Sequence, residues 1–223
     1  MSVKLFFDAI IKITVGIILI GLLVFLPAGS FSYWNGWLLM GLLFIPMFIA
    51  GIVMMIKSPD LLRRRLDIKE KQSEQKAVVA ISGLMFLVGF IVAGLNYRFE
   101  WMKMNNIFVI IGSIIFVLSY MVYAEVLREN AYLLRTIKVE VNQKLIDTGL
   151  YGIVRHPMYT ATIFLFLAMP LILGSWFTLI IFFIYPFVIV MRIKNEEEVL
   201  EKELKGYKEY KKKVKYKMIP FIW

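Results

Sequence analysis

Two polar segments of an otherwise apolar chain carry the residues whose types and spacing suit chemistry. The first contains Arg155, His156 and Tyr159, and His156 is the only histidine in the sequence. Pro157 removes a backbone donor and keeps His156 out of the helical region, so we expect Pro157 in the first turn of the next helix. A helix start offers free N–H groups and the positive end of a dipole, which suit an anionic or polar ligand. The first segment is therefore a candidate ligand-binding loop.

The second segment follows an apolar run and begins at Arg192. Glu196 lies four residues further on, so both side chains share one face of a continuous helix, while Glu197 lies about a third of a turn around it. Charges beside a membrane are costly when unpaired, so we expect Arg192 and Glu196 to pair or to hold a ligand.

Each segment also has a purely structural interpretation. The His156-Pro157 pair is compatible with a simple cap before a membrane helix, with an interfacial aromatic residue beside it. The charges after Arg192 are compatible with a solvated helix that continues beyond the bilayer. The residues alone leave these alternatives open.

Composition excludes several classes of protein and of site. The 223 residues are 60% apolar with a mean hydropathy of +0.75, which is too apolar for a soluble domain of this size. Because the chain has no cysteine and one histidine, it has no disulfide, no thiol nucleophile and no metal site built on cysteine or clustered histidine. Carboxylates are not spaced as in a metal loop, so no metal is expected. In so apolar a chain, the net charge of +10 indicates a membrane surface rather than nucleic acid.

Hydropathy predicts an all-α integral membrane protein with about six transmembrane helices. The last two are short and are separated only by Gly174-Ser175, which predicts a tilted C-terminal helical hairpin. Mixed charges over 57–76 predict a short helix on the membrane surface. We expect residues 1–124 to form a four-helix membrane region and 125–223 to form the functional core, within one integrated domain. The predicted spans are about 5–26, 36–56, 77–95, 107–124, 160–173 and 176–191.

The cations predict how the chain is oriented. With six spans and the N-terminus inside, 24 of the 26 Lys and Arg residues fall on the inner side, and only Arg98 and Lys103 fall outside. The positive-inside rule therefore predicts a multi-pass protein with both termini cytoplasmic. It also predicts that both polar segments lie on the same face of the membrane.

Together, the polar segments resemble the isoprenylcysteine carboxyl methyltransferase family of integral-membrane methyltransferases, which is itself similar to the phospholipid N-methyltransferases. The similarity covers roughly residues 125–223 and has three parts in the family's order. The matching residues are Lys144-Leu145, Gly149, Tyr151, Arg155-His156-Pro157 and Tyr159 for the cofactor loop, Arg192, Glu196-Glu197 and Leu200 for the Glu-Glu signature, and Gly206-Tyr207, Tyr210 and Ile219-Pro220 for the C-terminal end.

The resemblance implies that S-adenosylmethionine binds on the cytoplasmic side and that a lipophilic acceptor enters from the bilayer. Membrane lipids and a lipophilic or small methyl acceptor are the implied partners, and nucleic acid is not. By matched position, Arg192 and Glu196 are the implied catalytic, substrate-side pair. The implied cofactor-binding residues are Lys144, Leu145, Gly149, Tyr151, His156, Tyr159 and Glu197.

Physical chemistry agrees with this reaction but does not choose the acceptor. Methyl transfer from a sulfonium to an anionic acceptor removes charge, so a dry site that aligns the two partners favours it. Arg192 suits a carboxylate acceptor, which it could hold bidentately. For an amine or thiol acceptor, Glu196 suits either of two roles, taking up the proton or stabilising the cation.

Two other functions compete with a methyltransferase. The sterol reductases, which use NADPH, share a related C-terminal loop, although the His156-Pro157 pair fits the methyltransferase form better. A non-enzymatic scaffold or lipid-binding membrane protein is the third possibility.

Overall fold

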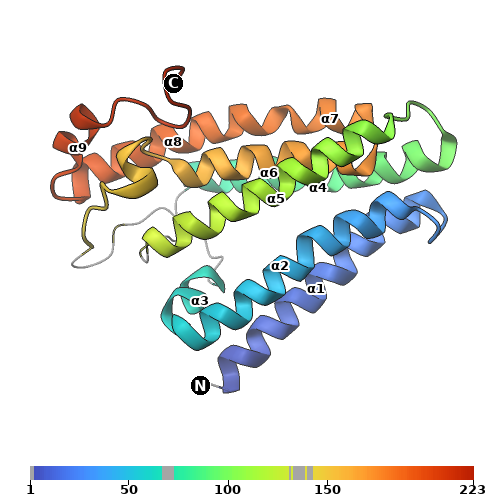
Figure 1. The fold of residues 1–223 in the computed structure, drawn as a ribbon, viewed down its shortest axis with the longest axis horizontal. Helices are drawn as coiled ribbons and strands as arrows, with labels where there is room; N and C mark the ends of the chain where they lie inside the picture. Colours follow the sequence, from blue (N-terminus) through green and yellow to red (C-terminus); the bar gives the residue numbers. More distant parts are fainter. Residues whose placement is uncertain (1–2, 67–72, 131, 133–138, 140–142) are drawn as a thin grey trace.

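The computed structural model describes residues 3–66, 73–130, 132, 139 and 143–223, and its regular elements are helices (Figure 1). They are α1 (Val3–Ala28), α2 (Trp34–Lys57), α3 (Pro59–Leu66), α4 (Ser73–Phe99), α5 (Asn106–Glu129), the 3₁₀ helix η1 (Gly149–Gly152), α6 (Pro157–Leu173), α7 (Trp176–Phe182), α8 (Ile184–Glu203) and α9 (Tyr207–Lys213).

Within the described residues, five helices are long and apolar enough to cross a membrane: α1, α2, α4, α5 and the combined α7–α8 helix, Trp176–Glu203. The prediction of an all-α fold is therefore confirmed for the described residues, and the five apolar helices fit an integral membrane protein. α6 is also apolar but has 17 residues, fewer than the roughly 20 that a straight span needs. The sixth span and the orientation of the termini stay predictions.

The predicted hairpin is present, but its second arm is divided. α6 ends at Leu173 with Gly174 in the left-handed conformation (φ +69°), and α7 begins two residues later. The sequence predicts one segment over 176–191, whereas the structure separates α7 from α8 at Phe183. Pro186 explains the interruption, because it has no N–H to donate to the carbonyl of Phe182 four residues earlier.

Helix ends also extend beyond the predicted spans on the side of the polar segments. α4 begins at Ser73 rather than near residue 77, and α5 continues to Glu129 rather than ending near 124. The predicted surface helix over 57–76 is present in part as α3, while residues 67–72 lie outside the described part of the chain.

The hydrophobic core joins both predicted regions of the chain. α5 and α6 pack closely, since a Cβ at Gly112 would lie 2.6 Å from the Leu171 Cβ. Figure 1 shows α1 and α2 as a pair set at an angle to the other long helices. The pair is tied to the end of α6 by Tyr33, whose hydroxyl donates to the Leu173 carbonyl at 2.6 Å. The predicted boundary at residues 124 and 125 falls inside α5, and the division into two regions stays a prediction.

Candidate functional site

The loop before α6 is shaped by a glycine and a carboxylate. Gly149 has a φ of +57°, and η1 begins there. The next residue, Leu150, donates its backbone N–H to both carboxylate oxygens of Glu129, at 3.2 and 3.0 Å. A Cβ at Gly149 would lie 1.8 Å from the Glu129 Oε1, so only glycine fits here without displacing the carboxylate. This contact fixes the loop to the end of α5.

Replacing Gly149 by alanine should therefore loosen the loop. The left-handed conformation costs a residue with a Cβ about 1–2 kcal/mol, before the collision with Glu129 is added. We expect hydrogen–deuterium exchange at the Leu150 amide to accelerate about 5–30-fold. Gly152→Ala is the matched control, because a Cβ there would stand 3.3 Å from the Asp147 carbonyl oxygen and Gly152 has no positive φ. Equal exchange in the two variants would show that Gly149 does not hold the loop.

The C-terminal tail supplies the other side of the loop. The backbone N–H groups of Arg155 and His156 donate to the carbonyls of Tyr216 and Lys217, at 3.0 and 2.7 Å. The tail also packs against the loop, in an apolar cluster that contains Leu204, Tyr207, Tyr210, Val214 and the partly buried Leu145. His156 itself is non-helical (φ −127°, ψ 60°), and Pro157 starts α6, as the sequence predicts.

Glu197 joins the loop to α8 through a buried ion-pair network. Its side chain is buried, and its Oε1 accepts from the Arg155 Nε at 2.8 Å and lies 3.2 Å from the His156 Nε2. Its Oε2 lies 3.6 Å from the Lys211 Nζ and 3.7 Å from the Lys217 Nζ. Arg155 also donates to the carbonyls of residues 214 and 215. The two polar segments therefore meet directly, around one carboxylate.

Tyr159 connects the two predicted catalytic residues. The Arg192 Nε donates to the Tyr159 hydroxyl at 2.8 Å, and this hydroxyl donates to the Glu196 carboxylate. The Arg192 guanidinium also lies over the Tyr159 ring, 5.9 Å from its centre. Arg192 and Glu196 share a face of α8, as the spacing predicts, and the tyrosine of α6 bridges them. A carboxylate that accepts from a neutral hydroxyl keeps lone pairs with which to accept a proton.

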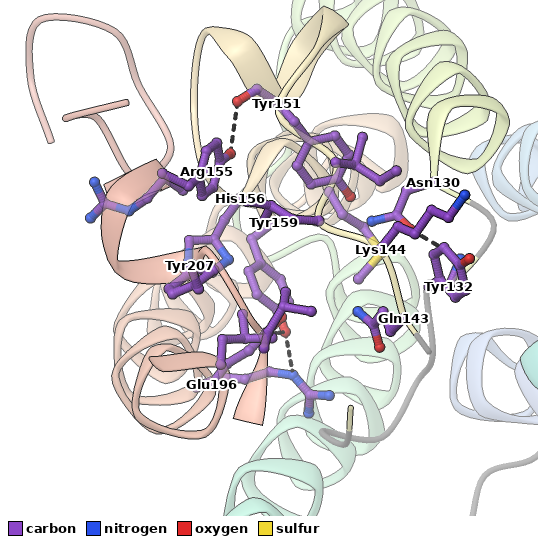
Figure 2. Close-up of a pocket in the computed structure, with 17 residues that line it drawn as sticks. Asn130, Tyr132, Gln143, Lys144, Tyr151, Arg155, His156, Tyr159, Glu196 and Tyr207 are labelled. Carbon is purple, nitrogen blue, oxygen red and sulfur yellow. Dashed lines mark hydrogen bonds between the residues drawn. The ribbon is translucent and has the colours of Figure 1, made fainter. Parts of the chain in front are cut away.

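These groups line one partly open hollow between α6, α8 and the tail. Figure 2 shows His156, Tyr159, Glu196 and Tyr207 turned towards one another within it. The lining residues are Asn130, Tyr132, Gln143, Lys144, Leu145, Ile146, Tyr151, Arg155, His156, Met158, Tyr159, Arg192, Glu196, Leu200, Leu204, Tyr207 and Tyr210.

Seven of the nine residues predicted for the site line this hollow, and Gly149 and Glu197 do not. In the structure Gly149 shapes the loop and Glu197 lies behind the His156 ring. Their assignment to cofactor binding is untested and stays a prediction. No sequence motif marks Asn130, Tyr132 or Gln143 as residues of the site. Tyr207 and Tyr210 fall in the C-terminal part of the resemblance, which implies no function for either.

Tyr207 has an unusual environment in this hollow. The residue is 3% exposed, yet its hydroxyl has no hydrogen-bond partner within the described part of the chain. Burial raises the pKa of Tyr207, and the nearby Glu197 and Glu196 carboxylates raise it further, so the hydroxyl stays a neutral donor. A buried donor without a partner is costly unless a ligand satisfies it.

Two comparisons with known proteins show what part of this chain is similar to. Residues 101–206 match the family model described as phospholipid methyltransferase. This range includes the loop, α6, α8 and the Glu-Glu signature. The chain is also 30% identical over 93 residues to the mouse (Mus musculus) Delta(14)-sterol reductase TM7SF2, a match that covers 40% of this chain and 22% of that protein. The chain thus spans about a fifth of this reductase. The resemblance to the isoprenylcysteine carboxyl methyltransferases in particular stays a prediction. Over residues 101–206, a little under half of its length, this chain is therefore similar to the phospholipid methyltransferase family.

Proposed function

We propose that the protein is a membrane methyltransferase that transfers the methyl group of S-adenosylmethionine to a lipophilic or small acceptor. One observation carries the proposal: the family-matched segment contains both polar motifs, and His156 and Glu197 from those motifs lie 3.2 Å apart. The two motifs therefore adjoin one hollow, which supports a site that holds a methyl donor between them. We further propose that the site faces the cytoplasm and that both termini lie on that side, as the distribution of cations predicts.

The residues of the hollow fit such a cofactor. S-adenosylmethionine carries a positive sulfonium, an amino-acid end and a ribose with hydroxyls, and when bound it supplies an electrophilic methyl carbon. The unpartnered Tyr207 hydroxyl is a donor for a carboxylate or a ribose oxygen. The proposed cofactor lining consists of Lys144, Leu145, Tyr151, His156 and Tyr159. Gly149, which shapes the loop, and Glu197, which contacts His156, would hold this lining in place.

Arg192 and Glu196 are the proposed catalytic pair. The acceptor's lone pair forms the new bond to the methyl carbon, while the electrons of the broken carbon–sulfur bond stay on sulfur. A thiol acceptor, or an amine whose methylated product is uncharged, must also lose a proton, and Glu196 is the carboxylate at the hollow that can accept it. Where the methylated amine keeps its positive charge, Glu196 would instead stabilise that cation. A carboxylate acceptor needs no base, and Arg192 would hold it in place.

Calorimetric titration with the demethylated cofactor product tests the proposal. The purified protein should bind S-adenosylhomocysteine and should bind NADPH much more weakly. A well-folded sample that binds neither ligand would support the scaffold hypothesis instead.

A sterol-type reductase is the second candidate, because the mouse relative is a sterol reductase by name. NADPH carries several phosphate charges, whereas S-adenosylmethionine carries a net positive charge at neutral pH. Binding of NADPH in preference to S-adenosylhomocysteine would favour the reductase. A direct comparison of the two titrations therefore separates the two candidates.

Tyr207→Phe should change the stability of the ligand-free protein and its affinity for ligand in opposite directions. Removing an unpartnered buried hydroxyl should raise the stability of the ligand-free protein, while it weakens S-adenosylhomocysteine binding by about 1 kcal/mol, or about fivefold. Tyr210→Phe is the matched control, since the Tyr210 hydroxyl already donates to the Tyr151 carbonyl at 2.7 Å. That variant should lose stability. If the two variants change stability in the same direction, the Tyr207 hydroxyl is not a donor reserved for a bound ligand.

A further inference from the structure

The tail ends in a turn that presents two apolar side chains outward. Within this turn, residues 219–223, the N–H of Trp223 donates to the Ile219 carbonyl at 3.1 Å, and Phe221 has a φ of +65°. The side chains of Phe221 and Ile222 are 87% and 77% exposed. A left-handed phenylalanine persists only where its surroundings hold it, and here Trp223 packs against the main hydrophobic core. The tail turn is thus held against the bundle through Trp223, while it exposes Phe221 and Ile222.

Basic and aromatic residues accompany the exposed pair. The Tyr216 ring packs against the Phe221 ring with 5.3 Å between centroids, and the Lys217 Nζ lies 4.7 Å from the centre of the Trp223 ring. Lys215, next to Tyr216, is exposed. An apolar tip with lysines beside it suits the boundary between acyl chains and anionic headgroups, where lipid covers the tip and the cations meet phosphate.

The three residues just before the tail turn contact the candidate site through their backbone carbonyls. Tyr216, Lys217 and Met218 accept hydrogen bonds from the N–H of Arg155, the N–H of His156 and the hydroxyl of Thr160, with the last at 2.8 Å. Figure 1 shows the chain after α9 returning along α8 towards the middle of the bundle. Any force that holds the tail turn in place therefore also holds the backbone of the cofactor loop.

We propose that Phe221 and Ile222 dock in the membrane leaflet beside the hollow, that the exposed Lys215 binds its anionic headgroups, and that this docking positions His156. The surface is separate from the methyl-transfer site and serves a lipid that is not a substrate. Only the effect on cofactor affinity rests on the proposed function. The location of the tail turn does not.

Spin labelling tests the location of the tail turn directly. Because the chain has no cysteine, one introduced cysteine is the sole site that a thiol-specific label can modify. Phe221→Cys is labelled with a nitroxide and placed in nanodiscs of phosphatidylcholine, with or without phosphatidylglycerol. We expect the label to be more accessible to oxygen than to a water-soluble nickel chelate, and more so with phosphatidylglycerol. Lys208→Cys, at an exposed position on α9, is the control and should stay accessible to nickel in both. A water-like signal at residue 221 in both lipids would overturn the docking, and a lipid-like signal independent of phosphatidylglycerol would overturn the role of anionic headgroups.

Ligand binding tests the link between the tail turn and the site. In anionic nanodiscs, the double variant Phe221→Ser and Ile222→Ser should bind S-adenosylhomocysteine about three- to tenfold more weakly, as expected when fewer molecules hold the loop in its binding conformation. Lys215→Gln should remove most of the gain in affinity that phosphatidylglycerol gives to the unmodified protein, whereas Lys208→Gln should not. Unchanged affinity in the double variant would show that docking does not position His156. If the unmodified protein binds no S-adenosylhomocysteine, the proposed function fails, and the labelling result stands on its own.

Discussion

Replacing Glu197 by alanine is expected to destabilise the protein more than any other single change near the hollow. The carboxylate is 5% exposed and is bonded to the equally buried Arg155 and His156. Its removal leaves the Arg155 guanidinium buried without its counter-charge, a change that costs about 3–5 kcal/mol in buried ion pairs. Because the same contacts join the loop, α8 and the tail, all three should loosen together. The expected result is a large fall in thermal stability in detergent, measured as the folded fraction after heating.

Two variants make this result specific. Glu198→Ala removes an exposed carboxylate from the neighbouring position on α8 and should change stability little. Glu197→Gln keeps the shape of the side chain but not its charge, so its thermal stability should lie between those of Glu197→Ala and Glu198→Ala. If Glu197→Ala is as stable as Glu198→Ala, the cations have other partners and the network does not hold the loop.

The fold is largely predictable from hydropathy and from proline and glycine positions. Long apolar runs locate the helices, and Pro157 correctly predicts where α6 begins. The ends of α4 and α5 are less predictable, because hydropathy marks the apolar core of a membrane and not the last backbone hydrogen bond. The break at Phe183 follows from Pro186, but many helices tolerate a proline, so the sequence alone does not require it.

The candidate site was predicted as a set of residues but not as an arrangement. The spacing of Arg192 and Glu196 places both on one face of a helix, and this holds in the structure. The bridge through Tyr159 depends on how α6 packs against α8, which no local pattern encodes. Glu197 looks like its neighbour Glu196 in the sequence, yet the first is enclosed by cations and the second faces the hollow. Tertiary contacts between positions about 40 residues apart separate the two roles.

Glu196→Gln is expected to have the largest effect on turnover if the acceptor carries a proton. The amide keeps the shape of the side chain and can still accept from the Tyr159 hydroxyl, but it cannot take up a proton. Loss of a general base typically lowers a rate by about 10²–10⁴-fold. Because the change lies on the acceptor side, S-adenosylhomocysteine should bind with nearly unchanged affinity. Transfer of a labelled methyl group to a total lipid extract, followed by mass spectrometry, measures the rate and identifies the product.

Arg192→Ala, compared with Glu196→Gln, distinguishes the possible acceptors. A carboxylate acceptor should depend chiefly on Arg192, whose loss removes a charged hydrogen bond to the substrate, and only weakly on the basicity of Glu196. An amine or thiol should show the reverse order. Tyr159→Phe should reduce turnover in either case, because it uncouples the guanidinium and the carboxylate that its hydroxyl now joins. Glu198→Gln, an exposed change on the same helix, is the control for both variants. Full turnover in both Arg192→Ala and Glu196→Gln would remove this pair from the catalytic site, even if the cofactor still binds.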